Sequence, residues 1–518
     1  MRPALRDTKW LLPSIALLLL IRLGVQVALY RAGFISLTAD EFGRTVVAAN
    51  WSKHPALYWS GVWLPFHAYS FGAALLLKWE LLWTPRLIAI TVGCGSIMLI
   101  YMLASSTFAS RAVGLVAAFL LAINPAHIWL SDVPLTELPT AALVFAGVWA
   151  TGRYLKRPQP RDLILASGAL ALANGFRFES WIISALFSLT LLGQVLAELA
   201  RRELRRGAAL GIATAAAAPW IFPLAWVVGN YVQLGDPLYF MGAIRAYKLQ
   251  WYGDETFYGK YVETFLKLDP YLTWLGVPAI ITCLALRHRS RAVQWYVTIT
   301  VIPLIAYMIL HGGQLEPPGN YIRYLAGYMF LFYPALAYML VRVAGALPLR
   351  QARWALLVAA LGLATLTQVP TAFQFTNDPA TDGLAVGQAI RALRTQDPDL
   401  ADRPVIIELS YWQYLAIHVG ANDMGQIVYD RTLDIESRAS QSLILTDEAL
   451  FRSCLGRYRA SYIIVKDPHL RAIIESNLRL LPTQTINGYS FYPVSNSLLE
   501  APPVDHAVAC PLSVGTGY

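Results

Sequence analysis

The residues best suited to chemistry are two adjacent carboxylates, Asp40 and Glu41, which follow an apolar run from Leu11 to Tyr30. Carboxylates at a membrane boundary are costly unless they are paired, solvated or used in a function. One interpretation is a solvated cap at the interface. The other is that the membrane portion of the chain holds this pair in a cavity at the membrane surface. The second gains support from other polar residues expected on the same side.

Asp132 and Glu137 lie in the sequence Ser131-Asp-Val-Pro-Leu-Thr-Glu137, between two further apolar runs. They are five residues apart around a proline, so they need not share one helical face. Glu137 begins the following apolar run. There it either stabilises the helix dipole or contributes a carboxylate to the cavity.

Arg177 and Glu179 place opposite charges two residues apart inside an apolar stretch. Such charges pair with each other, pair with neighbours or contact a ligand. Arg323 begins a late apolar run, in the sequence Tyr321-Ile-Arg-Tyr324. It is either an arginine that reaches the interface or a ligand for an anion. Tyr321 and Tyr324 are counted with it as binding candidates.

His67 closes an aromatic segment that contains a proline, Trp63-Leu-Pro-Phe-His67. It is a candidate for binding phosphate or for orienting Asp40. Three other histidines are expected on the same side of the membrane: His54, His127 and His311. Their spacing matches no familiar set of zinc ligands, so we predict neither a metal site nor another cofactor.

Composition identifies the class of protein that must position these residues. Of 518 residues, 56% are hydrophobic and 14% are charged, and the mean hydropathy is +0.47. Soluble domains carry about 25% charged residues, so these values indicate a membrane protein. The net charge of +9 is spread over short loops, which argues against a nucleic-acid partner. The first apolar run lacks a convincing cleavage site and is interpreted as a retained spanning helix.

Apolar runs of spanning length predict about eleven transmembrane helices. They lie near 9–30, 86–107, 112–130, 135–153, 162–178, 180–199, 207–229, 271–287, 292–310, 323–342 and 352–370. Lysine and arginine gather in alternate loops, which places the N-terminus in the cytoplasm and the C-terminal part outside it. We therefore predict a multi-pass protein of the inner or plasma membrane, in contact with its lipids.

Two domains are expected. Residues 1–375 form the transmembrane domain, with outward loops 31–85, 230–270 and 311–322. Residues 376–518 form an extracytoplasmic α/β domain, because helix patterns alternate with short β-branched runs. The expected elements are a helix at 384–395 and strands at 404–409, 460–466 and within 486–493. Cys454 and Cys510 lie in this domain, where a disulfide is possible in an oxidising compartment.

Three short motifs form an ordered series: Thr38-Ala-Asp-Glu41, Trp63-Leu-Pro-Phe-His67, and Ser131 with Thr136-Glu137. The series resembles the integral-membrane GT-C glycosyltransferases, especially the family of protein O-mannosyltransferases and lipid A aminoarabinose transferases. The resemblance covers residues 1–345, and its topology extends to the C-terminal domain. The Trp63–His67 segment departs from the proline-rich pattern of familiar members, which leaves the sugar and the acceptor open.

The resemblance implies a polyprenyl-phosphate-linked sugar as donor and a glycan, lipid or protein as acceptor, used on the outer face. Asp40 and Glu41 would lie at the reaction centre as catalytic residues, with Asp40 as the base or as the group that orients the acceptor, and inversion is expected at the anomeric carbon. Glu41 and Glu137 would bind acceptor or sugar hydroxyls, with Asp132 beside them. Arg323 would stabilise the leaving phosphate. Some GT-C enzymes use a divalent cation, but those most similar generally do not.

Two other classes of function remain open. A lipid or glycan transporter would line a path with intramembrane charges, but it predicts internal symmetry and acids at mid-membrane, and the sequence contains no repeat. A non-catalytic subunit of an envelope polysaccharide complex would not need Asp40, Glu137 and Arg323 together.

Overall fold

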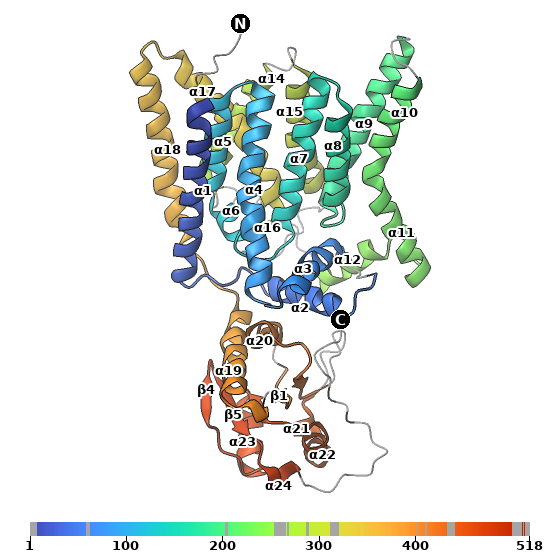
Figure 1. Cartoon of the computed structure of the whole chain (residues 1–518), viewed down its shortest axis with the longest axis vertical. Coiled ribbons are helices and arrows are strands. Elements are labelled where there is room, and N and C mark those ends of the chain that lie inside the picture. The colour runs from blue at the N-terminus through green and yellow to red at the C-terminus, as the bar shows by residue number, and fades with distance from the viewer. Residues whose placement is uncertain are drawn as a thin grey trace. The chain divides into compact units, whose positions relative to one another are not determined.

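The structure is a computed structural model, and it describes residues 8–57, 63–201, 206–252, 266, 269–285, 290–310, 321–400, 402–409, 412–431, 441–499, 510 and 512. The chain divides into two compact units (Figure 1). The membrane unit contains Met1–Phe34, Leu57–His67 and Arg86–Thr376, and the α/β unit contains Ile35–Ala56, Ala68–Pro85 and Asn377–Tyr518.

The membrane unit is helical throughout its described part. Its helices are α1 (Thr8–Arg31), α4 (Trp83–Phe108), α5 (Arg111–Ile123), α6 (Pro125–Leu130), α7 (Glu137–Lys156), α8 (Pro160–Ala173), α9 (Glu179–Ala200), α10 (Arg206–Ala217), η2 (Ala218–Trp220), α11 (Ile221–Leu234), α12 (Tyr239–Tyr252), α14 (Pro270–Leu284), α15 (Arg291–Leu310), α16 (Tyr321–Phe330), α17 (Tyr333–Ala346) and α18 (Arg350–Ala372). The first residues of α4, Trp83–Pro85, belong to the α/β unit.

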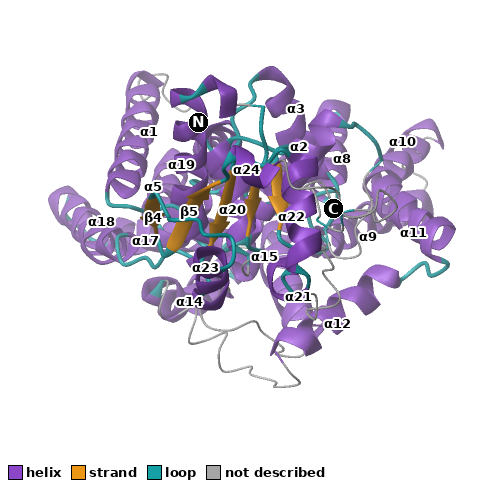
Figure 2. Cartoon of the chain, turned by 90° about the horizontal axis from the view of Figure 1, so that it is seen from below, coloured by secondary structure: helices purple, strands orange, loops and turns teal. Residues whose placement is uncertain are grey.

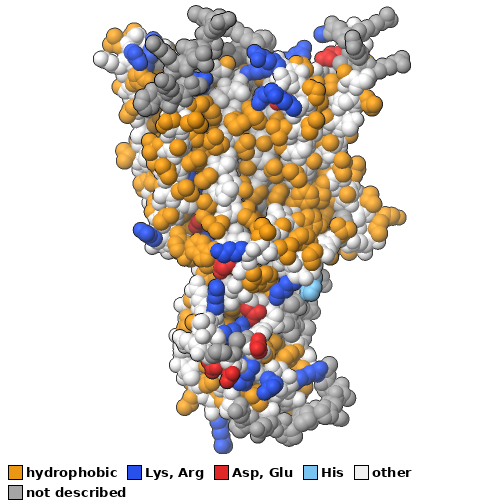
Figure 3. Space-filling model, viewed as in Figure 1, with side chains coloured by type: hydrophobic (Ala, Val, Ile, Leu, Met, Phe, Trp, Pro, Cys, Tyr) orange, Lys and Arg blue, Asp and Glu red, His pale blue; other side chains and the backbone are white. Residues whose placement is uncertain are grey.

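Seven helices among the described residues are long and apolar enough to cross a membrane. Hydrophobic side chains cover the visible face of this helical part in Figure 3. Each predicted span overlaps between one and three of these helices, and the predicted polytopic helical class is confirmed. The predicted span 112–130 is divided into α5 and α6, because Pro125 cannot continue the hydrogen bonding of α5. Asn124 caps α6 by accepting from the backbone N–H of His127 at 2.9 Å.

Parts of two predicted outward loops fall outside the described residues. Residues 253–265 of the loop at 230–270 and residues 311–320 of the loop at 311–322 are not described. Of the first, α12 is described (Tyr239–Tyr252), preceded by a turn at Gly235 with φ +74°.

The α/β unit has a mixed composition of helices and strands. Its elements are α2 (Asp40–Lys53), most of α3 (Phe66–Leu77), η4 (Pro379–Thr381), α19 (Asp382–Gln396), η5 (Pro398–Leu400), β1 (Val405–Ile407), α20 (Gln413–Ala421), β2 (Ile427–Tyr429), α21 (Leu443–Thr446), α22 (Glu448–Tyr458), β3 (Tyr462–Val465), α23 (Pro468–Ser476), β4 (Gln484–Ile486), β5 (Tyr489–Pro493) and α24 (Asn496–Leu499).

Its five strands form one sheet in the order β2-β1-β3-β5-β4, drawn in orange in Figure 2. β1 pairs in parallel with β2 and β3, whereas β5 is antiparallel to β3 and β4. All three residues of β1 are buried, as expected for a central strand covered on both faces. The predicted strands at 404–409 and 460–466 are β1 and β3. The single strand expected within 486–493 is part of a hairpin.

Two segments that precede α4 pack with the C-terminal residues. Asn422 at the end of α20 accepts from the backbone N–H of Leu81 through Oδ1 at 2.8 Å. Its carbonyl accepts from the indole N–H of Trp79 at 3.2 Å. Helix α2 packs on α20. Thus residues 35–56 and 68–85, expected in the transmembrane domain, share a compact unit with residues 377–518.

A disulfide joins Cys454 of α22 to Cys510, 56 residues apart. Closing a loop of this length restricts the unfolded chain and stabilises a domain by about 2–5 kcal/mol. We expect the double variant Cys454→Ser/Cys510→Ser to lose that much unfolding free energy, measured as a lower melting temperature of the full-length chain. Cys94→Ala, which removes a free and partly buried cysteine, is the control. An unchanged melting temperature in the double variant would contradict a stabilising disulfide.

Candidate active site

A cavity in the membrane unit lies between α7, α9 and α16 and contains about 400 Å³ of empty space, including its open mouth. Its polar lining consists of Glu137, Thr140, Arg177, Glu179, Ser180, Arg323 and Tyr328. The remaining lining is small or aliphatic: Ala141, Val144, Ile183 and Gly327. Charged groups are thus concentrated at one part of an otherwise apolar wall.

Glu137 is the central carboxylate of this cavity. It is the first residue of α7 and 4% exposed. Its Oε1 lies 2.6 Å from Nη1 of Arg177 and 3.3 Å from Nε of Arg323. Its position in the first turn also suits the helix dipole. Glu137 therefore lies at the N-terminus of α7 and pairs with two arginines of the cavity.

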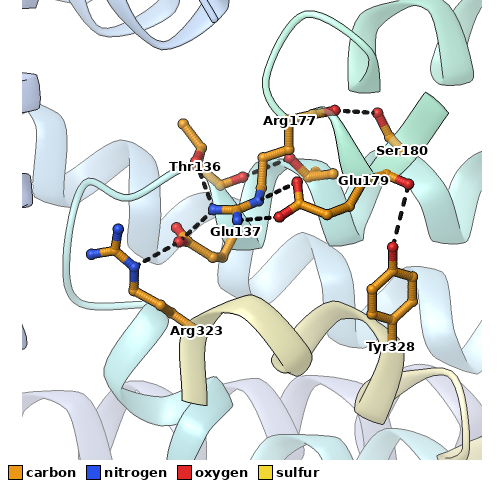
Figure 4. Close-up of polar contacts among 8 residues, drawn as sticks. Thr136, Glu137, Arg177, Glu179, Ser180, Arg323 and Tyr328 are labelled. Atoms are coloured by element: carbon orange, nitrogen blue, oxygen red, sulfur yellow. Dashed lines mark hydrogen bonds and ion pairs between the residues drawn. The ribbon is translucent and has the colours of Figure 1, made fainter. Parts of the chain in front are cut away.

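Arg177 is held in the turn between α8 and α9. Its guanidinium forms a two-point contact with Glu179, at 3.1 Å from Nε to Oε2 and 2.5 Å from Nη2 to Oε1. Tyr328 donates to the carbonyl of Glu179 at 3.3 Å, and Ser180 donates to the carbonyl of Arg177 at 2.7 Å. Figure 4 shows these contacts together with Glu137. The guanidinium of Arg177 is therefore held by Glu179 and Glu137, and its backbone carbonyl is held by Ser180.

The Trp63–His67 segment supports this same turn. The N–H of Phe66 donates to the carbonyl of Gly175 at 3.1 Å. A Cβ on Gly175 would lie 2.3 Å from the ring of Phe66, so only glycine allows this approach. His67 is fully buried, and its Nδ1 donates to the carbonyl of Leu64 at 2.8 Å. The segment thus braces the turn that carries Arg177.

The formal charges of the four charged residues of the cavity add up to zero, because two arginines face two glutamates. A phosphate that binds here must share the guanidinium groups with Glu137 and Glu179. Arg323 reaches Glu137 through Nε, and its two terminal nitrogens point away from Glu137 in Figure 4. Arginine binds phosphate through two parallel N–H groups, so this side of Arg323 suits an anion.

Asp132 belongs to a second buried network of the membrane unit. Its Oδ2 lies 3.6 Å from Nη1 of Arg86, which also donates to the Asp132 carbonyl at 3.1 Å. Arg22 of α1 donates to the His127 carbonyl at 2.9 Å and to Ser131 Oγ at 2.8 Å. These contacts fix the connection between α6 and α7. Asp132 does not line the cavity described above.

Asp40 and Glu41 lie in the α/β unit, at the start of α2. Asp40 is partly exposed, and its backbone N–H donates to Thr38 Oγ1 at 3.2 Å. Glu41 is fully buried, and its Oε1 accepts from the N–H of Leu37 at 2.9 Å. Glu41 supports the turn that precedes it.

The structure therefore groups the predicted residues in four ways. One cavity contains Glu137, Arg177, Glu179 and Arg323, whereas Asp132 and His67 lie elsewhere in the membrane unit. The α/β unit contains Asp40 and Glu41. The side chains of Tyr321 and Tyr324 lie outside the described residues. Sequence reasoning missed Arg22 and Arg86, although Arg22 interrupts the first apolar run. Within the described residues, no group of three His, Cys, Asp or Glu side chains could hold a metal ion.

No protein-family profile matches the chain, and no curated protein sequence matches it significantly. Its fold is similar to that of ArnT from Cupriavidus metallidurans bound to undecaprenyl phosphate, with a TM-score of 0.56, 13% identity, and coverage of 95% of this chain and 99% of ArnT. It is also similar to the oligosaccharyltransferase AglB from Archaeoglobus fulgidus in complex with an inhibitory peptide and a dolichol-phosphate. There the TM-score is 0.52, the identity 14%, and the coverage 89% of this chain and 70% of AglB. The chain thus has the GT-C glycosyltransferase fold.

Proposed function

We propose that this GT-C-fold protein is a hexosyl- or pentosyltransferase that moves a sugar from a polyprenyl-phosphate donor to an acceptor hydroxyl outside the cytoplasm. The observation that carries the proposal is the cavity with two arginines, in a fold similar to that of proteins whose structures contain undecaprenyl phosphate or dolichol-phosphate. An apolar wall with a local cluster of cations suits a lipid phosphate. The acceptor is a glycan, a lipid or a protein.

Arg323 and Arg177 would stabilise the donor phosphate. Negative charge grows on that phosphate as its bond to the sugar breaks, so a preorganised cation lowers the barrier. Arg177 is fixed by Glu179, while Arg323 has terminal nitrogens that point away from Glu137. Arg323 is therefore the first candidate for direct contact with phosphate.

Asp40 would be the general base. The acceptor oxygen attacks the anomeric carbon, Asp40 takes the hydroxyl proton, and the bond from that carbon to the phosphate oxygen breaks. Lipid phosphate leaves with the bonding electron pair, and the anomeric configuration inverts. Glu41, which we also predicted at the reaction centre, would act through the turn it supports. Glu137 remains a candidate for binding sugar hydroxyls, together with Glu179. The other substrate-binding candidates, of lower priority, are Asp132, His67, Tyr321 and Tyr324.

Orientation is part of the proposal. The disulfide of the α/β unit supports an oxidising compartment for this unit, in agreement with the charge asymmetry of the loops. A thiol reagent that does not cross membranes should label Cys454 and Cys510 in intact cells after reduction. Labelling only in broken cells would contradict an extracytoplasmic α/β unit.

Removal of Arg323 tests the phosphate site. We expect Arg323→Ala to weaken binding of undecaprenyl phosphate to the purified full-length protein by about tenfold or more, since a charge-assisted hydrogen bond contributes about 1.5–3 kcal/mol. Arg342→Ala is the control, because Arg342 is exposed and lies over the ring of Tyr338. Equal affinities of the Arg323→Ala and wild-type proteins would exclude this role.

A further inference from the structure

The turn that carries Asp40, residues Ile35–Asp40, is held by side chains from the segment that begins the C-terminal part of the α/β unit. Asn377 accepts two backbone N–H groups of the turn through one oxygen, Oδ1. The distances are 2.8 Å from Ile35 and 3.1 Å from Ser36. An amide oxygen has two lone pairs, so a single asparagine can hold two consecutive N–H groups.

Asp378 contacts the same turn closer to Asp40. Its carboxyl group faces the backbone N–H of Ala39, the residue directly before Asp40, and its Oδ1 accepts from the N–H of Ala380 at 2.8 Å. Its own N–H donates to Ser36 Oγ at 3.1 Å. Ser36 Oγ also lies 2.5 Å from Thr381 Oγ1. The two segments are therefore joined at several consecutive residues.

Two further N–H groups of the turn are held locally. Glu41 accepts from Leu37, and Thr38 accepts from Asp40. The turn thus has a defined hydrogen-bond partner for the N–H of residues 35, 36, 37 and 40. Since each such bond contributes about 0.5–1.5 kcal/mol, the set favours one backbone conformation over its alternatives.

The segment that holds the turn is itself rigid. Asp378 caps η4, whose first residue is Pro379, and η4 leads directly into α19. Helix α19 approaches α20 so closely that a Cβ on Gly383 or Gly387 would lie 2.2 Å from a backbone oxygen of α20. Helix α20 in turn packs on α2, which begins at Asp40. The segments before and after the turn are therefore connected through the packing of η4, α19, α20 and α2.

We propose that Asn377 and Asp378 are positioning residues that hold the Ile35–Asp40 turn in the conformation in which the Asp40 carboxylate acts. This inference rests on the proposed function, in which Asp40 is the general base. It gives the C-terminal part of the chain an indirect part in the reaction, through the backbone that precedes the base rather than through contact with substrate. The carboxyl group of Asp378 also interacts electrostatically with that of Asp40. Burial raises the pKa of Asp378 above its ordinary value, and the charge of Asp40 raises that pKa further, against the hydrogen bond from Ala380.

Asn377→Ala and Asp378→Ala are expected to lower kcat by about tenfold or more while KM for the donor changes less than twofold, because a displaced base slows the chemical step without affecting donor binding. Asp378→Asn should retain at least half of kcat. It keeps an amide oxygen that can accept two N–H groups, as Asn377 does, and removes only the charge.

Asn422→Ala is the matched control. Asn422 lies in the same unit and also holds a backbone N–H of an N-terminal segment, that of Leu81, without contacting the Asp40 turn. Its φ of +55° makes alanine strained there, so it should cost at least as much stability as Asn377→Ala. It should nevertheless keep the kcat of the wild-type protein.

The assay uses full-length protein in proteoliposomes and the undecaprenyl-phosphate-linked sugar that the wild-type protein turns over. Wild-type kcat in Asn377→Ala and Asp378→Ala would overturn the inference, as would an equal loss in Asn422→Ala or no recovery in Asp378→Asn. Asp40→Asn assayed beside them separates the two proposals. If Asp40→Asn is inactive while Asn377→Ala and Asp378→Ala are fully active, only the positioning role fails. A fully active Asp40→Asn removes the proposed base itself.

Discussion

Replacement of Asp40 by asparagine is expected to lower the rate of sugar transfer by about 10²–10⁴-fold, the range that a general base contributes. Asparagine has nearly the shape of aspartate but cannot take a proton from the acceptor hydroxyl. Asp40 is partly exposed, and its backbone N–H donates to Thr38 Oγ1, a hydrogen bond that asparagine keeps. The melting temperature and the binding of undecaprenyl phosphate should therefore change little.

The control for this charge removal is Asp382→Asn. Asp382 begins α19 of the same unit, and its carboxylate lies 3.9 Å from Lys466 in a half-exposed ion pair. It should keep the transfer rate of the wild-type protein. Full activity of Asp40→Asn, or an equal loss in both variants, would contradict the assignment of Asp40 as base.

Replacement of Arg177 by alanine is expected to destabilise the membrane unit by about 3–5 kcal/mol, because it breaks a buried ion pair and leaves carboxylates uncompensated. Glu137 and Glu179 both contact this guanidinium, and the Arg177 side chain is only 11% exposed. The variant should also bind undecaprenyl phosphate weakly. The measurements are thermal unfolding in detergent and lipid-phosphate binding.

Stability and phosphate binding can be separated in the double variant Arg177→Ala/Glu137→Gln. Removal of the Glu137 charge should recover part of the lost stability, since without Arg177 the buried Glu137 carboxylate keeps only Arg323 of its two described ion-pair partners. Binding of undecaprenyl phosphate should not recover. Arg342→Ala is again the control, because Arg342 of the same unit is exposed and lies over the ring of Tyr338. Recovery of binding in the double variant would mean that Arg177 serves structure alone.

The helical part of the fold could be predicted from the sequence because apolar length alone specifies a spanning helix. The same holds for Arg177, Glu179 and Glu137, since a charge inside an apolar run must find a partner or a function. Their convergence on one cavity depends on the packing of α7, α9 and α16, which periodicity does not report. Arg323 illustrates this, because it follows Glu137 by 186 positions in the sequence, yet its Nε lies 3.3 Å from Oε1 of Glu137.

The α/β unit shows what the sequence pattern missed. Asn487 and Gly488 both have positive φ, at 46° and 81°, in the turn between β4 and β5. Asn-Gly is the strongest short-range hairpin signal, so this turn could have been predicted. The joining of Asn377 to Ile35 could not, because hydrogen bonds between segments 342 residues apart leave no local pattern.

The central claim, transfer from a polyprenyl-phosphate sugar, is tested most directly by following the donor itself. Full-length protein in proteoliposomes receives a panel of undecaprenyl-phosphate-linked hexoses and pentoses, with membranes of a deletion strain as acceptor. Mass spectrometry then measures free undecaprenyl phosphate. We predict that one donor releases undecaprenyl phosphate and its sugar appears on the acceptor, and that Asp40→Asn abolishes both. Intact donor throughout the panel, or donor moved across the bilayer without cleavage, would contradict the proposed transfer.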